Sequence, residues 1–223
     1  MRNLLYSILA TCILAMIFII YPEVDIMFSK LFFSEMHNKF YLANNSFLKF
    51  MSKFAYFLAF LLLSSVSISI LKTFIKTKSF RFEIYKSQII VLLVFLIGNL
   101  IVVQLYSKPY FERARPIKVK EFYGHLAFSS AFEVSNQCKH NCSFVSFHTS
   151  IGMLFLIYSF CQICKRREVM IATSLLFTVF LGLMRISQGR HFLSDVVFSA
   201  CFMMITYYLI IMFCEIYRDK KYK

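Results

Sequence analysis

Long apolar stretches alternate with charged stretches along the chain, and the apolar ones contain almost no ionisable side chains. A helix needs roughly 17–25 mostly apolar residues to cross the hydrocarbon core of a bilayer. Six stretches approach or reach that length: residues 4–20, 54–71, 88–105, 149–164, 169–184 and 196–213. The pattern therefore predicts an all-α integral membrane protein built as a bundle of six transmembrane helices.

The segments between the apolar stretches carry their own signals. The first stretch ends in Tyr21-Pro22-Glu23 without a small-residue cleavage site, so we expect an uncleaved first helix. In the mixed segment 21–53, Asp25 is positioned to cap a short amphipathic helix that would lie in the membrane interface. Asn99 falls inside the third stretch, where an amide usually forms a hydrogen bond to a neighbouring helix.

Composition narrows the class of protein further. The chain of 223 residues is 59% hydrophobic, with a mean hydropathy of +0.67, which excludes an ordinary soluble domain. The net charge of +14 lies between the apolar stretches, where topology and anionic lipid explain it better than nucleic acid does. We therefore expect a single membrane-embedded domain over residues 1–223 that binds no nucleic acid.

The distribution of Lys and Arg predicts the orientation of the six spans. The N-terminus, the loop 72–86, the turn 165–168 and the tail carry 13 of the 25 Lys and Arg residues in short segments. Positive residues in short loops mark the cytoplasmic side. Both termini are thus predicted to be cytoplasmic, and the segments 106–148 and 185–195 to share the outer face with the interfacial segments.

The segment 185–195 concentrates ionisable groups at the edge of the apolar region. It contains Arg185, Arg190, His191 and Asp195, and charges beside hydrocarbon are by default candidates for a functional site. Asp195 follows His191 by four residues, a spacing at which a carboxylate can hold one imidazole nitrogen and fix the tautomer. Arginines suit an anion such as phosphate. The alternative is a basic loop that only sets topology, beside a helix-starting Asp.

Two further motifs lie on the same predicted face. Segment 108–116 places Lys108 seven residues before Arg115-Pro116, and segment 145–148 places Ser146 two residues before His148. Taken singly, each has a simpler explanation: an interfacial lysine, a helix N-cap, or two histidines in a metal site. No carboxylate or thiol spacing completes a familiar metal site.

In order and spacing, the three motifs resemble the signature of the type 2 phosphatidic acid phosphatase family, K-x6-RP, then PSGH, then SR-x5-H-x3-D. The six-span layout is also that of the family. The matching positions are Lys108, Arg115, Pro116, Ser146, His148, Arg185, His191 and Asp195. The chain departs from the signature at Val145, Phe147 and Met184, where the family usually has Pro, Gly and Ser. Phe147 is expected to alter the local turn.

The resemblance implies a role for each matching residue. His191 would be the nucleophile that forms a phosphohistidine, Asp195 would orient it, and His148 would serve as the acid and then the base. Lys108, Arg115, Ser146 and Arg185 would bind the phosphoryl oxygens. This division suits phosphoryl transfer, which needs mainly positioning and charge neutralisation. Fixed cations can supply that neutralisation, so no metal or other cofactor is expected.

Other charged and sulfur-containing residues stand close to the signature. Arg113 and Arg190 match no signature position and are candidates for contacts to a substrate headgroup. Cys138 and Cys142 precede Ser146 on the predicted outer face, where an oxidising compartment would permit a disulfide between them.

The resemblance also implies a function. We expect a phosphatase of the bacterial inner membrane, with its active site facing the periplasm, that removes a phosphate monoester from a membrane lipid. The 4′-phosphate of lipid A is the first expectation, and polyprenyl pyrophosphate and phosphatidylglycerophosphate are alternatives. A lipid transporter or lipid-binding protein is the non-enzymatic alternative, although a transporter would need charges within its spans.

Overall fold

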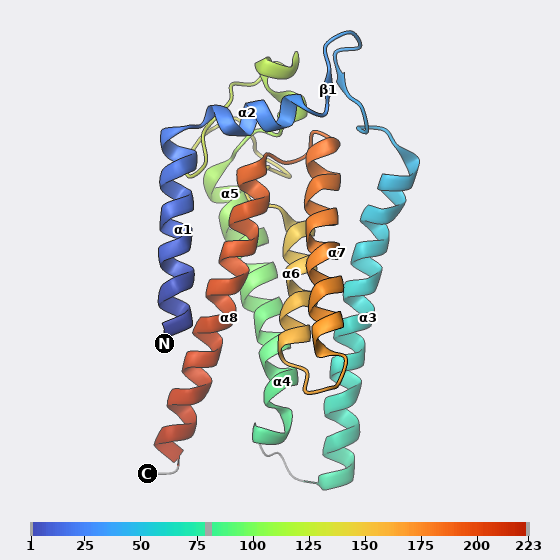
Figure 1. The fold of residues 1–223 in the computed structure, drawn as a ribbon, viewed down its shortest axis with the longest axis vertical. Helices are drawn as coiled ribbons and strands as arrows, with labels where there is room; N and C mark the ends of the chain where they lie inside the picture. Colours follow the sequence, from blue (N-terminus) through green and yellow to red (C-terminus); the bar gives the residue numbers. More distant parts are fainter. Residues whose placement is uncertain (1, 79–81, 222–223) are drawn as a thin grey trace.

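A computed structural model describes residues 2–78 and 82–221 and shows a bundle of long helices with a small cap at one end (Figure 1). Residues 1, 79–81 and 222–223 lie outside this description, and with them Arg81 of the predicted basic loop and Lys223 of the tail. The long helices are α1 (Arg2–Ile20), α3 (Ser46–Thr77), α4 (Phe82–Leu93) with its π-helical continuation η1 (Val94–Ser107), α6 (Phe147–Phe160), α7 (Arg167–Ser187) and α8 (Leu193–Lys221). The cap contains α2 (Glu23–Lys30), the antiparallel pair β1 (Phe33–Ser34) and β2 (Lys39–Phe40), α5 (Lys108–Phe111) and the 3₁₀ turns η2 (Pro116–Lys118) and η3 (Lys120–Phe122).

Five of the described helical segments are long and apolar enough to cross a membrane. They correspond to five of the six predicted spans, but several helices extend beyond the apolar stretch. The helix α3, for example, begins at Ser46 rather than near residue 54, because Asn45 caps it through a bond from the Leu48 amide. Polar residues continue a helix after hydrocarbon ends, so hydropathy locates a span but not the ends of its helix.

The remaining predicted span, 149–164, corresponds to α6, which has only 14 residues. Such a helix is about 21 Å long, less than the roughly 30 Å of the hydrocarbon core. It packs mainly against α7, and also against α8, η1 and α3, so most of its side chains are buried. Gly152 permits the approach to α7, since a Cβ there would lie 2.6 Å from the Cα of Thr178. The six-span layout stays a prediction.

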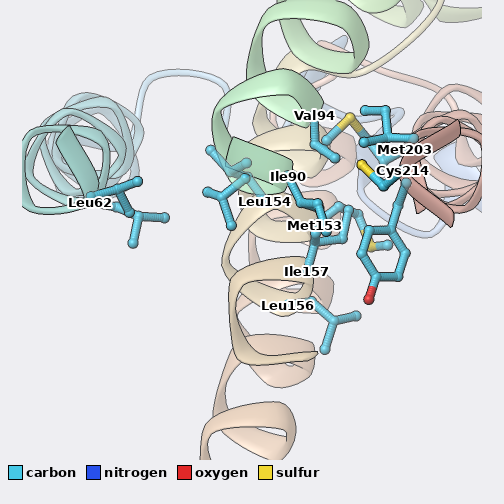
Figure 2. Packing of buried hydrophobic residues seen from close by; sticks show 13 residues of the cluster. Leu62, Ile90, Val94, Met153, Leu154, Leu156, Ile157, Met203 and Cys214 are labelled. Carbon is cyan, nitrogen blue, oxygen red and sulfur yellow. The ribbon is translucent and has the colours of Figure 1, made fainter. Parts of the chain in front are cut away.

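The helix α1 begins and α8 ends at the same end of the bundle, away from the cap (Figure 1). The first apolar helix is packed against the last, with the rings of Phe18 and Phe198 5.7 Å apart. In the interior, side chains from α3, α4, η1, α6 and α8 form an apolar cluster that includes Ile90, Met153 and Met203 (Figure 2). A polar bond also joins two helices in this interior: the Asn99 side chain donates to Ser150 Oγ at 2.9 Å, which confirms the predicted helix–helix contact.

A short helix is present where one was expected after the first apolar stretch, as α2, but the predicted role of Asp25 as its cap is wrong. Pro22 occupies the N-cap position, and Asp25 lies inside the first turn with 1% of its surface exposed. Proline suits the start of a helix because the first N–H groups have no partner within the helix, so the N–H that proline lacks is not needed there. The carboxylate of Asp25 is thereby free to bind groups on other segments, which are described below.

Candidate active site

The three signature motifs meet at the capped end of the bundle, although they come from different elements. Lys108 begins α5, His148 lies in the first turn of α6, and Arg185 lies in the last turn of α7. The charge on Arg185 acts on both Lys108 and His148, and the charges on Arg115 and Arg185 act on His191. Residues up to 83 positions apart in the sequence, Lys108 and His191, therefore belong to one cluster.

The histidine and carboxylate of segment 185–195 adopt the predicted pairing. His191 lies in the loop before α8 and Asp195 in the first turn of α8, with Nδ1 and Oδ2 3.5 Å apart. Asp195 Oδ2 also accepts a hydrogen bond of 2.8 Å from the Phe192 amide. The 3.5 Å between His191 Nδ1 and Asp195 Oδ2 is longer than a hydrogen bond, as is common for catalytic pairs without substrate. Nδ1 faces the carboxylate, so Nε2 is the nitrogen available for chemistry.

The loop that carries His191 is shaped by a glycine. Gly189 has φ +66, and a Cβ at this position would lie 2.4 Å from the Phe40 ring. Both the left-handed conformation and the close approach of β2 exclude a larger side chain. The Gly189 carbonyl accepts from the Ile117 amide at 3.0 Å, which fixes the loop against the segment that carries Arg115.

Burial lowers the pKa of His191 to about 3, while Asp195 opposes the shift and Arg115 and Arg185 add to it. The imidazole is therefore neutral near pH 7, and its contact with Asp195 is then not an ion pair. A neutral imidazole with its proton on Nδ1 presents a lone pair on Nε2, which is the form required of a nucleophile.

Three cationic side chains of the signature are buried or half-buried and only partly satisfied by the protein. Lys108 Nζ donates to Gln104 Oε1 at 2.9 Å, Arg185 donates to Gln188 Oε1 at 2.8 Å, and Arg115 donates to Asn141. The Nε atoms of Arg115 and Arg185 are buried and have no hydrogen-bond partner among the described residues. Buried donors normally have a partner, so this arrangement suits an anion with several oxygens.

The second motif forms the start of α6. Ser146 is the N-cap residue, and its Oγ accepts from the amide and the hydroxyl of Thr149 at 3.4 and 3.0 Å. Phe147 stands where the family usually has Gly. Its ring lies 5.7 Å from Lys108 Nζ and forms a cation–π contact with it. Val145 is fully buried in an aromatic cluster with Phe144. These two departures from the signature thus alter packing and leave the side chains at the matching positions in the cluster.

Two residues that contact His148 were not predicted from the sequence. Ser52 on α3 places its hydroxyl 2.5 Å from His148 Nε2, and the Tyr56 ring is centred 4.9 Å from the imidazole. Their spacing of four residues puts both on one face of α3. A Ser and a Tyr at that spacing are too common to single out, which is why the sequence pattern missed them.

Arg113 does not occupy the expected position at the substrate surface. Only 1% of it is exposed, and its guanidinium binds the carboxylates of Asp25 and Asp195 at 2.8 and 2.7 Å. The expectation of a headgroup contact is therefore wrong for Arg113, because its donors are already used inside the protein. Arg190 is half-buried, and its charge acts on those of Arg115 and Arg185.

The loop before α6 is closed by a disulfide between Cys138 and Cys142, as the sequence suggested. Two residues of this loop contact the cluster: Asn141 accepts from Arg115, and Ser143 donates to Asp195 Oδ2. Ser143 also donates its amide to the carbonyl of Arg113 at 2.9 Å. The disulfide therefore restrains a loop that supports two members of the signature.

Comparison with known proteins shows which family the chain belongs to. The sequence model of the PAP2 superfamily matches residues 88–218, which include all three motifs. The chain belongs to the PAP2 superfamily. A lipid A 4′-phosphatase of Francisella tularensis subsp. novicida (strain U112) is 33% identical over 218 residues, covering 96% of each chain. A lipid A 4′-phosphatase of Rhizobium leguminosarum is 37% identical over 103 residues, covering 46% of this chain and 44% of the relative.

A solved structure has the same fold as this PAP2 protein. It is a transmembrane PAP2-type phosphatidylglycerolphosphate phosphatase from Bacillus subtilis, with a TM-score of 0.61 over 96% of this chain and 97% of that one. At 18% identity, this likeness concerns the fold alone. Together, family and relatives identify the protein as a membrane-embedded lipid phosphatase, a phosphoric monoester hydrolase.

Proposed function

We propose that this PAP2 protein removes the 4′-phosphate of lipid A at the periplasmic face of the bacterial inner membrane, through a phosphohistidine on His191. The observation that carries the proposal is the relation to the Francisella lipid A 4′-phosphatase over 96% of both chains. The site supports it chemically, since unsatisfied guanidinium donors lie around a neutral imidazole.

In the first step, Nε2 of His191 attacks the phosphorus of the ester. The P–O bond breaks, its electron pair remains on the sugar oxygen, and that oxygen takes a proton from His148. The three signature cations and Ser146 neutralise and orient the phosphoryl oxygens, which is the main demand of this chemistry. Asp195 stabilises the positive charge that develops on the ring of His191.

In the second step, His148 takes a proton from water, and the resulting hydroxide oxygen attacks the phosphorus. The P–N bond breaks, which returns His191 to its neutral form and releases inorganic phosphate. Ser52 binds His148 Nε2 in the substrate-free site. We infer that the substrate displaces this hydroxyl and takes its place beside the imidazole. Burial lowers the pKa of His148 to about 2 in the substrate-free site, and the charge of Arg185 adds to the shift. The negative charge of a bound phosphate opposes this shift and favours the protonated imidazole needed for the first step.

The substrate assignment predicts a specific product. Incubation of purified protein with lipid A should remove one phosphate and retain the phosphate at the 1 position, as measured by tandem mass spectrometry. The same preparation should be offered polyprenyl pyrophosphate and phosphatidylglycerophosphate. Unchanged lipid A beside consumption of either alternative would contradict the substrate assignment.

The proposed orientation predicts cytoplasmic termini. It is supported by the excess of Lys and Arg in the short loops away from the site and by the disulfide at the site, since disulfides persist in oxidising compartments. A green fluorescent protein fused after Lys223 should fluoresce, and alkaline phosphatase fused there should be inactive. The opposite pair of results would place the site on the cytoplasmic face.

A further inference from the structure

Two carboxylates from distant parts of the chain share one buried arginine beside the candidate nucleophile. Arg113 donates from one terminal nitrogen to Asp195 Oδ1 at 2.7 Å and from the other to Asp25 Oδ2 at 2.8 Å. Asp25 comes from the short helix α2, 88 residues earlier in the sequence than Arg113. The proposed mechanism uses neither Arg113 nor Asp25.

The protein occupies every nitrogen of this guanidinium. Nε donates to the Ser129 carbonyl at 2.9 Å, and the nitrogen that binds Asp195 also donates to Ser194 Oγ at 2.8 Å. The rings of Phe192 and Phe128 face the guanidinium, with their centres 4.4 and 5.4 Å from its central carbon. A group enclosed in this way cannot bind substrate, so an effect on turnover must pass through a neighbour.

The neighbour closest to the chemistry is the carboxylate of Asp195. Its Oδ1 is held by Arg113, whereas its Oδ2 accepts from the Phe192 amide and the Ser143 hydroxyl and faces His191. Arg113 thus holds the Asp195 carboxylate in one rotation about its Cβ–Cγ bond. Without it, Oδ1 would be a buried acceptor without its charged partner, and the carboxylate could turn away from the imidazole.

Asp25 holds the arginine from its other side. Its Oδ1 accepts from the Ser194 amide and its Oδ2 from the Ser194 hydroxyl at 2.8 and 2.5 Å, so α2 is joined to the start of α8. Burial raises the pKa of Asp25, and the charge of Arg113 opposes the rise. The cluster is therefore a structural link between the helix α2 and the turn that carries the candidate nucleophile.

We propose that Arg113 is a positioning residue: it holds the Asp195 carboxylate against His191, and Asp25 anchors Arg113. The inference rests on the proposed function, in which His191 is the nucleophile. Arg113→Gln should lower kcat by on the order of 10- to 100-fold, by analogy with the loss when a group that orients a metal ligand is removed. KM should stay within about twofold, because Arg113 does not reach the substrate.

A double-mutant cycle separates positioning from a general loss of structure. Arg113→Gln in an Asp195→Asn background should add less than about threefold to the loss, since the carboxylate through which it acts is gone. If the two substitutions together lower kcat by the product of their separate factors, the proposal is wrong. A raised KM with unchanged kcat would also overturn it, because it would mean that Arg113 binds substrate.

Removing one partner from a buried charged cluster can unfold a protein. The double variant Arg113→Gln/Asp25→Asn removes one positive and one negative charge and so keeps the net charge of the cluster. It should retain the melting temperature better than the single variant and still show the reduced kcat. Normal kcat in this folded variant would contradict a positioning role. The matched control is Lys118→Gln, which removes an exposed cation from the same segment and should behave as wild type.

A readout that needs no turnover distinguishes failure of this inference from failure of the proposed function. In [¹⁵N]histidine-labelled protein, the ring nitrogens of His191 are assigned by their absence in His191→Ala. Arg113→Gln and Asp195→Asn should shift these signals in the same direction, away from the form protonated on Nδ1. If wild type releases no phosphate from any ester, the proposed function fails while this spectrum still decides the inference. Unchanged His191 signals in Arg113→Gln would overturn it.

Discussion

His191→Ala should abolish phosphate release, with a loss on the order of 10⁵-fold or more, comparable to the removal of other enzymatic nucleophiles. The physical reason is that no other group replaces Nε2 as the attacking atom. His191 is 2% exposed and its imidazole is neutral near pH 7, because burial lowers its pKa to about 3. The measurement is release of inorganic phosphate from lipid A by protein purified in detergent.

Two controls accompany this variant. His140→Ala removes an exposed histidine of the disulfide loop and should leave turnover unchanged. Treatment of the wild type with EDTA should also leave turnover unchanged, since Lys108, Arg115 and Arg185 supply the positive charge near the phosphoryl group. A His191→Ala protein with normal turnover, or strong inhibition by EDTA, would contradict the mechanism.

His148→Ala should lower kcat for a lipid substrate by about 10²- to 10⁴-fold, the usual contribution of general acid–base catalysis. The alkoxide of a sugar leaves poorly without a proton, so the first step depends on His148. A nitrophenolate leaves without one, so p-nitrophenyl phosphate bypasses that requirement. With this substrate the variant should give a rapid burst of nitrophenol, followed by slow turnover limited by attack of water.

The contact between Ser52 and His148 provides a matched comparison. Ser52→Ala removes the hydroxyl that binds Nε2 but leaves the acid in place. We expect it to affect kcat far less than His148→Ala and to produce no burst. Equal losses for lipid and p-nitrophenyl phosphate in His148→Ala, without a burst, would contradict its assignment as the acid of the first step.

The order and spacing of the motifs predicted which side chains lie close together. Each motif lies near the end of a helix, and because successive helices run in opposite directions, those ends lie on one side of the bundle. His191 and Asp195 are four residues apart and contact each other even though α8 begins only at Leu193. Ser146 is an N-cap, as its position before an apolar stretch indicated. Local chemistry of this kind can be read from sequence because the interacting groups are near neighbours.

The contacts across the bundle could not be predicted in the same way. Asp25, Arg113 and Asp195 meet only because α2 lies over the start of α8, and no spacing in the sequence reports that packing. Arg113 was expected at the surface because it adjoins a signature residue, but burial is a property of the fold. Similarly, hydropathy located the apolar segment 149–164 but not that α6 is short and enclosed by other helices.

The most direct test of the central claim is to trap the phosphoenzyme. Wild-type protein mixed with lipid A labelled with ³²P at the 4′ position and quenched within milliseconds should carry label that is stable to alkali and labile to acid, as expected for phosphohistidine. Peptide mapping should place it on His191, and His191→Ala should carry none. Turnover of lipid A without labelled protein at any quench time, or with the label on another residue, would contradict the account.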